Sequence, residues 1–142
     1  MLSTDVTPKV PDKRPILSAL WIYLSLNYIY CDHLEIMEPA VFKNLATGHV
    51  GALEVTQGFL LAAALLLQIP FLMVVLSKLL NYKANRFLNI LAATLMILVQ
   101  LGTMGMGTSA SPVYAFYSII EILCNVIIVW IAWKWADQSF QA

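Results

Sequence analysis

The chain has 142 residues, of which 61% are hydrophobic and 11% are charged, and its formal net charge is zero. A soluble domain of this size is ordinarily about half apolar and about a quarter charged, and the chain has no basic run that would bind nucleic acid. The composition excludes an ordinary soluble domain and a nucleic-acid-binding protein, and it indicates an integral membrane protein of one domain.

The first fifteen residues, MLSTDVTPKVPDKRP, are polar and interrupted by prolines. The apolar run that follows them exceeds the roughly 7–15 residues of a signal-peptide core, and no small-residue cleavage site comes after it. We therefore expect residues 1–15 to form a cytoplasmic tail and the first apolar run to remain in the protein as a membrane helix.

Four apolar blocks follow, near or above the roughly 20 residues that a helix needs to cross a bilayer core of about 30 Å. The predicted spans are 16–36, 53–79, 87–104 and 113–133. The second is longer than necessary and contains Pro70, which predicts a kink or a tilt. None of them alternates as a barrel strand would. We predict an all-α integral membrane four-helix bundle over residues 16–135, followed by a cytoplasmic tail over 136–142.

The basic residues predict the orientation of this bundle. Every Lys and Arg except Lys43 lies before the first span, around the second connection or after the fourth span. Since cytoplasmic loops are rich in Lys and Arg, we expect both termini on the cytoplasmic side of the membrane. Three tryptophans would then anchor the inner interface, namely Trp130, Trp133 and Trp135.

Each predicted span carries polar residues that recur at helical spacing and so share one face. The first has Ser18, Trp21, Ser25, Tyr28, Asp32 and Glu35; the second has Glu54, Gln57 and Gln68; the third has Asn89 and Gln100; and the fourth has Tyr114, Tyr117, Glu121 and Asn125. We expect the four polar stripes to point inward and to meet in the bundle.

The depths of these residues predict an acidic cavity that opens outward. Glu121 lies about 12 Å inside the outer end of its helix, at 1.5 Å per residue, and Asn27 lies at a similar depth. Asp32 lies closer to the outer surface. The predicted residues for ligand binding or proton relay are Asn27, Tyr28, Asp32, Glu54, Gln57, Tyr117, Glu121 and Asn125. Tyr114 would also line the path, and Gln100 is a further candidate for its floor.

Glu121 is the most informative of these residues, because a charged side chain at the bilayer centre costs at least a few kcal/mol. No basic residue lies at its depth in any predicted span. Our hypothesis is that Glu121 is protonated at rest, or loses its proton when a cation or an amine ligand arrives. The alternative is that the intramembrane polar residues only form hydrogen bonds between helices, which is open for Gln68, Asn89 and Gln100. Glu35 and Glu38 are interpreted as solvated charges at a helix end.

The sequence predicts neither a metal site nor a cofactor. No pair of residues has the HxxxH or ExxH spacing that metal sites in helical bundles use. Cys31 and Cys124 should differ in depth by about 9 Å, whereas bridged Cα atoms lie within about 7 Å of each other. We therefore expect two free, buried thiols.

Three segments resemble a group of bacterial four-helix membrane proteins of unknown function: LSALWIYLSLNYIYCD, IPFLMVVLSKLLNYKANRFLNI and YSIIEILCNVIIVWIAWKW. The group is loosely similar to the DoxX-type four-helix proteins, which are associated with respiratory or redox membrane complexes. The resemblance covers about residues 17–135 and implies a membrane bundle in a bacterial inner membrane, but no activity. The recurring positions that it implies are Asn27, Tyr28, Asp32, Asn81, Arg86, Asn89, Glu121 and Trp133.

The leading interpretation is a small membrane protein that binds a small cation, a proton or an amphipathic ligand in the cavity, with proton-coupled transport as one use. Four spans would need a second copy to form a complete pathway. One alternative is a structural or accessory subunit of a larger membrane complex, and another is an intramembrane acid–base enzyme acting on a lipid-like substrate. The expected partners are the lipid bilayer and either a second copy or a larger complex, with no nucleic acid.

Overall fold

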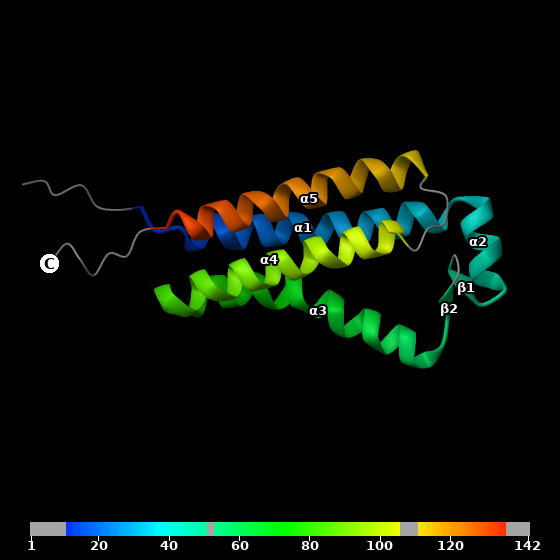
Figure 1. The fold of residues 1–142 in the computed structure, drawn as a ribbon, viewed down its shortest axis with the longest axis horizontal. Helices are drawn as coiled ribbons and strands as arrows, with labels where there is room; N and C mark the ends of the chain where they lie inside the picture. The colour runs from blue at the N-terminus through cyan, green and yellow to red at the C-terminus, as the bar shows by residue number, and fades with distance from the viewer. Residues whose placement is uncertain (1–10, 51–52, 106–110, 136–142) are drawn as a thin grey trace, which may run out of the picture.

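The computed structural model describes residues 11–50, 53–105 and 111–135, and it is built almost entirely from helices (Figure 1). Four of them are long: α1 (Arg14–Ile36), α3 (Gln57–Leu79), α4 (Tyr82–Gly105) and α5 (Pro112–Trp133). We call the end where α1 begins and α5 ends the tail end. The opposite end, called the cap end, carries the short helix α2 (Pro39–Ala46) and the strands β1 (His49–Val50) and β2 (Leu53–Glu54).

Among the described residues, three helices are long and apolar enough to cross a membrane: α3, α4 and α5. Their lengths of 22 to 24 residues correspond to roughly 33–36 Å, which exceeds a bilayer core of about 30 Å. Helix α1 has 23 residues but carries more polar side chains, and it does not belong to this group. The sequence predicted four such spans.

Polar caps decide where three of the helices begin. The side chains of Thr56, Asn81 and Ser111 each accept a hydrogen bond from the backbone N–H three residues later, at 3.0–3.1 Å, which satisfies a donor that the first turn leaves free. The cap at Asn81 starts α4 at Tyr82, ahead of the apolar run. Because the sequence prediction followed hydropathy, it placed this start at residue 87 and the start of the second span at 53.

The segment between α1 and α3 has structure that the sequence analysis did not predict. Helix α2 follows Glu38 with Pro39 in its first turn, a position that proline favours. It ends before Gly48, whose φ of +80° suits a residue without a side chain. Strands β1 and β2 then pair in antiparallel register, His49 with Glu54 and Val50 with Leu53. The pairing holds Leu53 and Glu54 outside α3.

Helix α3 is bent, and its N-terminal half diverges from α4 towards the cap end (Figure 1). Pro70 lies inside the helix, where it has no N–H to donate to the carbonyl of Leu66 and its ring crowds that turn. The other long helices stay close: α1 packs on α5 and α5 packs on α4. The bend therefore opens the bundle at its cap end.

Polar side chains are buried in this fold and large apolar ones are exposed, the reverse of the usual soluble arrangement. Asn85, Asn89 and Glu121 are at most 1% exposed, whereas Leu61 and Leu65 are each 63% exposed. Lipid solvates apolar side chains, and polar residues in a membrane face the interior of a bundle. The sequence predicted that all four polar stripes point inward; the pattern agrees with this for most residues of the first, third and fourth stripes, and not for the second.

At the tail end, buried amides form a closed hydrogen-bond network around Asn89. Its Oδ1 accepts from Trp21 Nε1 at 2.7 Å and from Ser77 Oγ at 3.2 Å, and its Nδ2 donates to the side chain and backbone of Asn85. Asn85 Nδ2 donates to the backbone oxygen of Ser77 at 2.6 Å. The network joins α1, α3 and α4, so these residues lock helices together.

Gln68 does not take part in the interior, and its predicted inward orientation is wrong. It is exposed, because the inward face of α3 is instead formed by apolar and small residues that recur at helical spacing, with Met73 and Ser77 both buried. Met73 and Ser77 lie on that face at a spacing of four residues. The two amides predicted for the third span, Asn89 and Gln100, are buried as expected.

Candidate functional site

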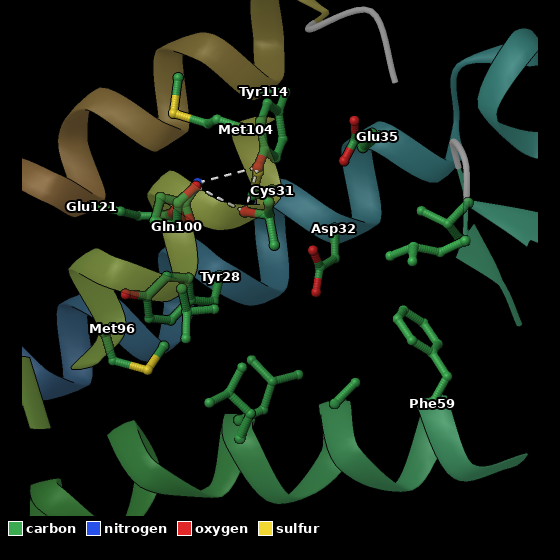
Figure 2. A pocket seen from close by; sticks show the side chains of 17 residues that line it. Tyr28, Cys31, Asp32, Glu35, Phe59, Met96, Gln100, Met104, Tyr114 and Glu121 are labelled. Atoms are coloured by element: carbon green, nitrogen blue, oxygen red, sulfur yellow. Dashed lines mark hydrogen bonds between the residues drawn. The ribbon is translucent and has the colours of Figure 1, made fainter. Parts of the chain in front are cut away.

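A cavity of about 310 Å³ lies in the cap half of the protein, between the diverging part of α3 and the other long helices (Figure 2). Helices α1, α4 and α5 supply its polar side chains. Helix α3 faces them across the cavity, and Val50 of β1 and Leu53 of β2 complete the wall near the cap end. The bend turns the N-terminal half of α3 away from α4 (Figure 1), and the cavity lies beside this diverging half.

Three carboxylates line the cavity. Asp32 and Glu35 come from successive positions on one face of α1, and Glu121 comes from α5. Asp32 is accessible, Glu35 is half-buried, and Glu121 is 1% exposed. The ion pair found among the described residues, Arg14 with Asp12 at 3.9 Å, lies at the tail end. The three cavity carboxylates thus have no basic partner within the described part of the chain.

Glu121 is buried without its full set of hydrogen bonds. Its Oε1 is inaccessible and has no hydrogen-bond partner within residues 11–50, 53–105 and 111–135. A buried acceptor without a donor ordinarily costs about 1–3 kcal/mol, and more when it is charged. The free oxygen therefore indicates a position that a ligand or a proton can fill.

The amide donors close to Glu121 are already engaged by other groups. Gln100 Nε2 donates to Ser118 Oγ at 2.6 Å and contacts the hydroxyl of Tyr114 at 3.5 Å. Thr103 Oγ1 lies 3.0 Å from the same Tyr114 hydroxyl. These bonds tie α4 to α5 along one side of the cavity and leave the carboxyl group of Glu121 unassisted (Figure 2).

A second buried contact ties α1 to α5 behind the cavity. Asn125 Nδ2 donates to the hydroxyl of Tyr28 at 2.9 Å and to the backbone oxygen of Glu121 at 2.9 Å. Asn125 Oδ1 is buried and has no partner within the described residues. The contact fixes the ring of Tyr28 beside the turn that carries Glu121, so the cavity floor is held by two helices.

The wall formed by α3 is apolar. Its side chains in the cavity are those of Phe59, Ala63, Leu66 and Leu67, and α4 adds Met96, Val99 and Met104. Figure 2 shows Phe59 pointing into the cavity from α3, across from Asp32. One side of the cavity therefore offers hydrocarbon contacts, and the other offers carboxylates, hydroxyls and an amide.

The structure brings together some of the predicted site residues and separates others. Tyr28, Asp32 and Glu121 line the cavity, and Asn125 lies directly behind Tyr28. Four predicted residues do not line it: Asn27, Glu54, Gln57 and Tyr117. The contacts and positions of these four residues differ from one residue to the next.

Asn27 is buried, but its Nδ2 donates to the backbone oxygen of Tyr23 one turn earlier, so it does not orient a carboxylate as expected. Glu54 is exposed on β2, and Gln57 is exposed in the first turn of α3. Neither Glu54 nor Gln57 lies on the helical face that the sequence predicted, because α3 begins only after Thr56. Tyr117 is half-buried and packs edge-on against Phe116 at 5.6 Å.

One carboxylate that lines the cavity was not predicted as a site residue. Glu35 was interpreted as a solvated helix-end charge, yet it lies in the cavity wall. The signal was present, because Glu35 follows Asp32 by three residues on the same stripe. Thr103, Met96 and the α3 side chains carried no polar pattern that could have marked them, since the bend in α3 places them there.

Cys31 and Cys124 are free and buried, which confirms the prediction from their depths. Among the described residues, no three His, Cys, Asp or Glu side chains converge as the ligands of a metal ion would. The three carboxylates are therefore distributed along the cavity and do not form one coordination shell.

Comparison with known proteins identifies a family but no function. No curated protein and no solved structure matches the chain. The likeness to DoxX-type proteins stays a prediction. Residues 9–142 match the family described as "Family of unknown function (DUF6326)". Since the match covers nearly the whole chain, the protein belongs to this family.

Proposed function

We propose that the protein is a four-helix membrane protein that binds a small cation or an amphipathic ligand in the cap-half cavity, and that Glu121 exchanges a proton for it. The observation that carries the proposal is the oxygen of Glu121, which is buried in a cavity wall and has no partner within the described residues. Transport across the membrane is the use that best fits such an exchange.

We include α1 among the spanning helices because several polar residues of its middle turns are buried and the residues beside them on the outer side are apolar. Ser25 and Tyr28 are buried, whereas Ile22, Leu26 and Ile29 are 45–50% exposed. The average hydropathy of α1 is therefore a poor guide to the surface that it would present to lipid. With α1 included, all four long helices cross the bilayer.

The distribution of basic residues supports cytoplasmic termini, and the resemblance to bacterial four-helix membrane proteins is the reason for proposing a bacterial inner membrane. Among the described residues, every Lys and Arg except Lys43 belongs to the tail end, at the start of α1, around the α3–α4 connection or after α5. Positive residues remain on the cytoplasmic side. The cap end and its cavity would then face the exterior, and ligand would enter from there.

Proton exchange at Glu121 would take place in a defined set of titratable groups. From α1 the cavity wall receives Asp32, Glu35, Tyr28 and Cys31, and from α5 it receives Tyr114 besides Glu121 itself; α3 and α4 contribute no titratable side chain to it. All these groups are neutral or negative. They favour a proton or a cation at Glu121 and disfavour an anion.

A structural or accessory subunit remains the second candidate, and the Asn89 network is the observation that favours it. That network is closed by hydrogen bonds within the protein and needs no ligand. The cavity differs from it because the Oε1 atom of Glu121 has no hydrogen-bond partner in the part of the chain that the structure describes. The two candidates therefore predict different contents for the cavity.

The direct test is an experimental density map of the protein extracted gently, with its native lipids, from the membrane in which it is expressed. We expect an ordered molecule, ion or water chain touching both Asp32 and Glu121. A dry cavity, with Glu121 held only by protein hydrogen bonds, would contradict ligand binding and would support the structural subunit.

A further inference from the structure

The two walls of the cavity differ in chemistry, and this difference narrows the class of ligand. Asp32 and Glu35 of α1 and Glu121 of α5 line the cavity together with the hydrocarbon side chains of α3, and Figure 2 shows Asp32 pointing towards α3. A ligand that contacts both walls must carry positive charge at one end and an apolar body at the other. The inference below rests on the proposed function, because it assumes that this cavity binds a ligand.

The size of the cavity favours an organic cation over a metal ion. A volume of about 310 Å³ falls at the lower end of the roughly 300–1,000 Å³ typical of small-molecule pockets. A bare metal ion needs several oxygen ligands at close range, and within the described residues no three acidic, histidine or cysteine side chains converge in that way. The carboxylates are spread along a space that a molecule can fill.

The hydrogen-bonding state of Glu121 favours a cation that carries N–H groups. Its Oε1 needs a donor, and the amide nitrogens of Gln100 and Asn125 donate to Ser118 and Tyr28 instead. Once the Glu121 side chain turns Oε1 towards the cavity, an ammonium N–H would supply a charge-assisted hydrogen bond, about twice as strong as a neutral one. A quaternary ammonium has no N–H and would leave the oxygen unsatisfied.

The α3 wall would hold the apolar body of the ligand. Phe59 and Leu66 are two turns apart on α3, and Met96 and Met104 of α4 also line the cavity. Methionine side chains adapt to irregular apolar shapes, so the wall suits a class of alkyl or aryl groups. We propose that the cavity binds a protonated primary amine with an apolar body, its ammonium group on Glu121 and its body against α3.

The test uses the full-length protein in lipid nanodiscs and measures saturable binding of radiolabelled n-octylamine, which is cationic at neutral pH. Unlabelled competitors with the same octyl chain separate the contributions of charge and of N–H donors to binding. 1-Octanol has no charge, and octyltrimethylammonium has charge but no N–H. We expect octylamine to compete fully, octyltrimethylammonium to compete at least about tenfold more weakly, as a lost charged hydrogen bond implies, and octanol not to compete.

Two pairs of matched variants locate the binding. Glu121→Gln should weaken octylamine binding at least about tenfold, whereas Glu54→Gln, which removes an exposed carboxylate at the cap end outside the cavity, should leave it unchanged. Leu66→Ala removes three carbon atoms and should weaken it at least about fourfold, the effect of losing apolar contact equivalent to one buried methylene group. Leu65→Ala removes the same atoms from a side chain that is 63% exposed, and it should have no effect.

The outcomes separate this inference from the proposed function. Equal competition by octyltrimethylammonium, or full competition by octanol, would overturn the amine class on the wild-type protein alone, whatever the variants do. Saturable binding of ²²Na⁺ that depends on Glu121, without octylamine binding, would overturn the class and leave the proposed function standing. If neither probe binds in a way that depends on Glu121, both are wrong.

Discussion

Glu121 and Asn89 are both buried polar side chains, but their surroundings assign them different roles. Asn89 has partners for its oxygen and its nitrogen from three helices. Glu121 has an inaccessible oxygen with no partner in the described part of the chain. A satisfied polar group stabilises the helix contacts that it makes, whereas an unsatisfied one weakens the fold and persists where it serves another purpose.

Replacing Asn89 by Ala should destabilise the protein by about 1–3 kcal/mol, because Trp21, Ser77 and Asn85 each lose a buried partner. Gln68→Ala is the matched control, since Gln68 is an exposed amide on α3. Unfolding monitored by circular dichroism in detergent measures both. Equal stability of the two variants would show that the network does not hold the helices together.

Replacing Glu121 by Gln should leave the unfolding temperature unchanged or raise it. The amide keeps the size of the side chain and removes a carboxyl group that is buried without a cation. A thermal melt in detergent, compared with that of Glu54→Gln, measures the effect. A large decrease that is specific to Glu121→Gln would identify this carboxyl group as a structural residue and would argue against a binding role.

The candidate site could be predicted from the sequence only where helical spacing continued undisturbed. Tyr28, Asp32 and Glu121 were identified because each lies on a polar stripe of an uninterrupted helix. Glu54 and Gln57 were misplaced because the cap at Thr56 starts α3 later than hydropathy suggests. Glu35 followed the stripe, but its position near the helix end obscured its role.

Among the elements, α3 determines whether a cavity exists at all. Pro70 is buried inside this helix, and the helix diverges from α4 on the N-terminal side of it (Figure 1). The sequence predicted a kink or a tilt at Pro70, but it did not predict that α3 would diverge from α4 and leave a cavity. The direction of a bend depends on how the helix packs against its neighbours, which sequence spacing does not report.

Pro70→Ala should restore the missing backbone hydrogen bond, straighten α3 and narrow the cavity. Spin labels at Leu61 and Ile29, both exposed, report the separation of α3 and α1 by pulsed electron resonance in a background without Cys31 and Cys124. We expect a shorter distance and weaker octylamine binding. Pro112→Ala is the control, because proline in the first turn of α5 costs no hydrogen bond.

An unchanged distance in the Pro70→Ala variant would show that tertiary packing, and not the proline, bends α3.

The boundaries of the elements could not be predicted from hydropathy alone. Hydropathy located the long helices, but the start of α4 at Tyr82 and the cap-end elements α2, β1 and β2 depend on caps and turns.

At the scale of the whole molecule, the fold separates a locked tail half from an open cap half. The Asn89 network closes the tail half across α1, α3 and α4. The cavity occupies the cap half, where α3 has diverged. A single chain therefore offers access from one end, and a complete path across the membrane requires another copy or a change of shape.

We expect the protein to form a homodimer. Photobleaching steps of single fluorescently labelled proteins in nanodiscs would count its copies. A monomer that still moves octylamine across liposome membranes would contradict the need for a second copy.

We also expect the C-terminus to lie in the cytoplasm. A reporter that is active only in the cytoplasm should give signal when it is fused to the C-terminus and no signal when it is inserted in the α1–α3 connection. Signal from the inserted reporter would reverse the orientation.

The central claim is that Glu121 gives up a proton when a cation binds, and infrared difference spectroscopy of the full-length protein in bilayers tests it most directly. At neutral pH we predict a carboxylic-acid C=O band that is present without ligand, disappears with saturating octylamine, persists in Glu54→Gln and is missing from Glu121→Gln. A band that octylamine leaves unchanged, or the lack of any band that depends on Glu121, would contradict the claim.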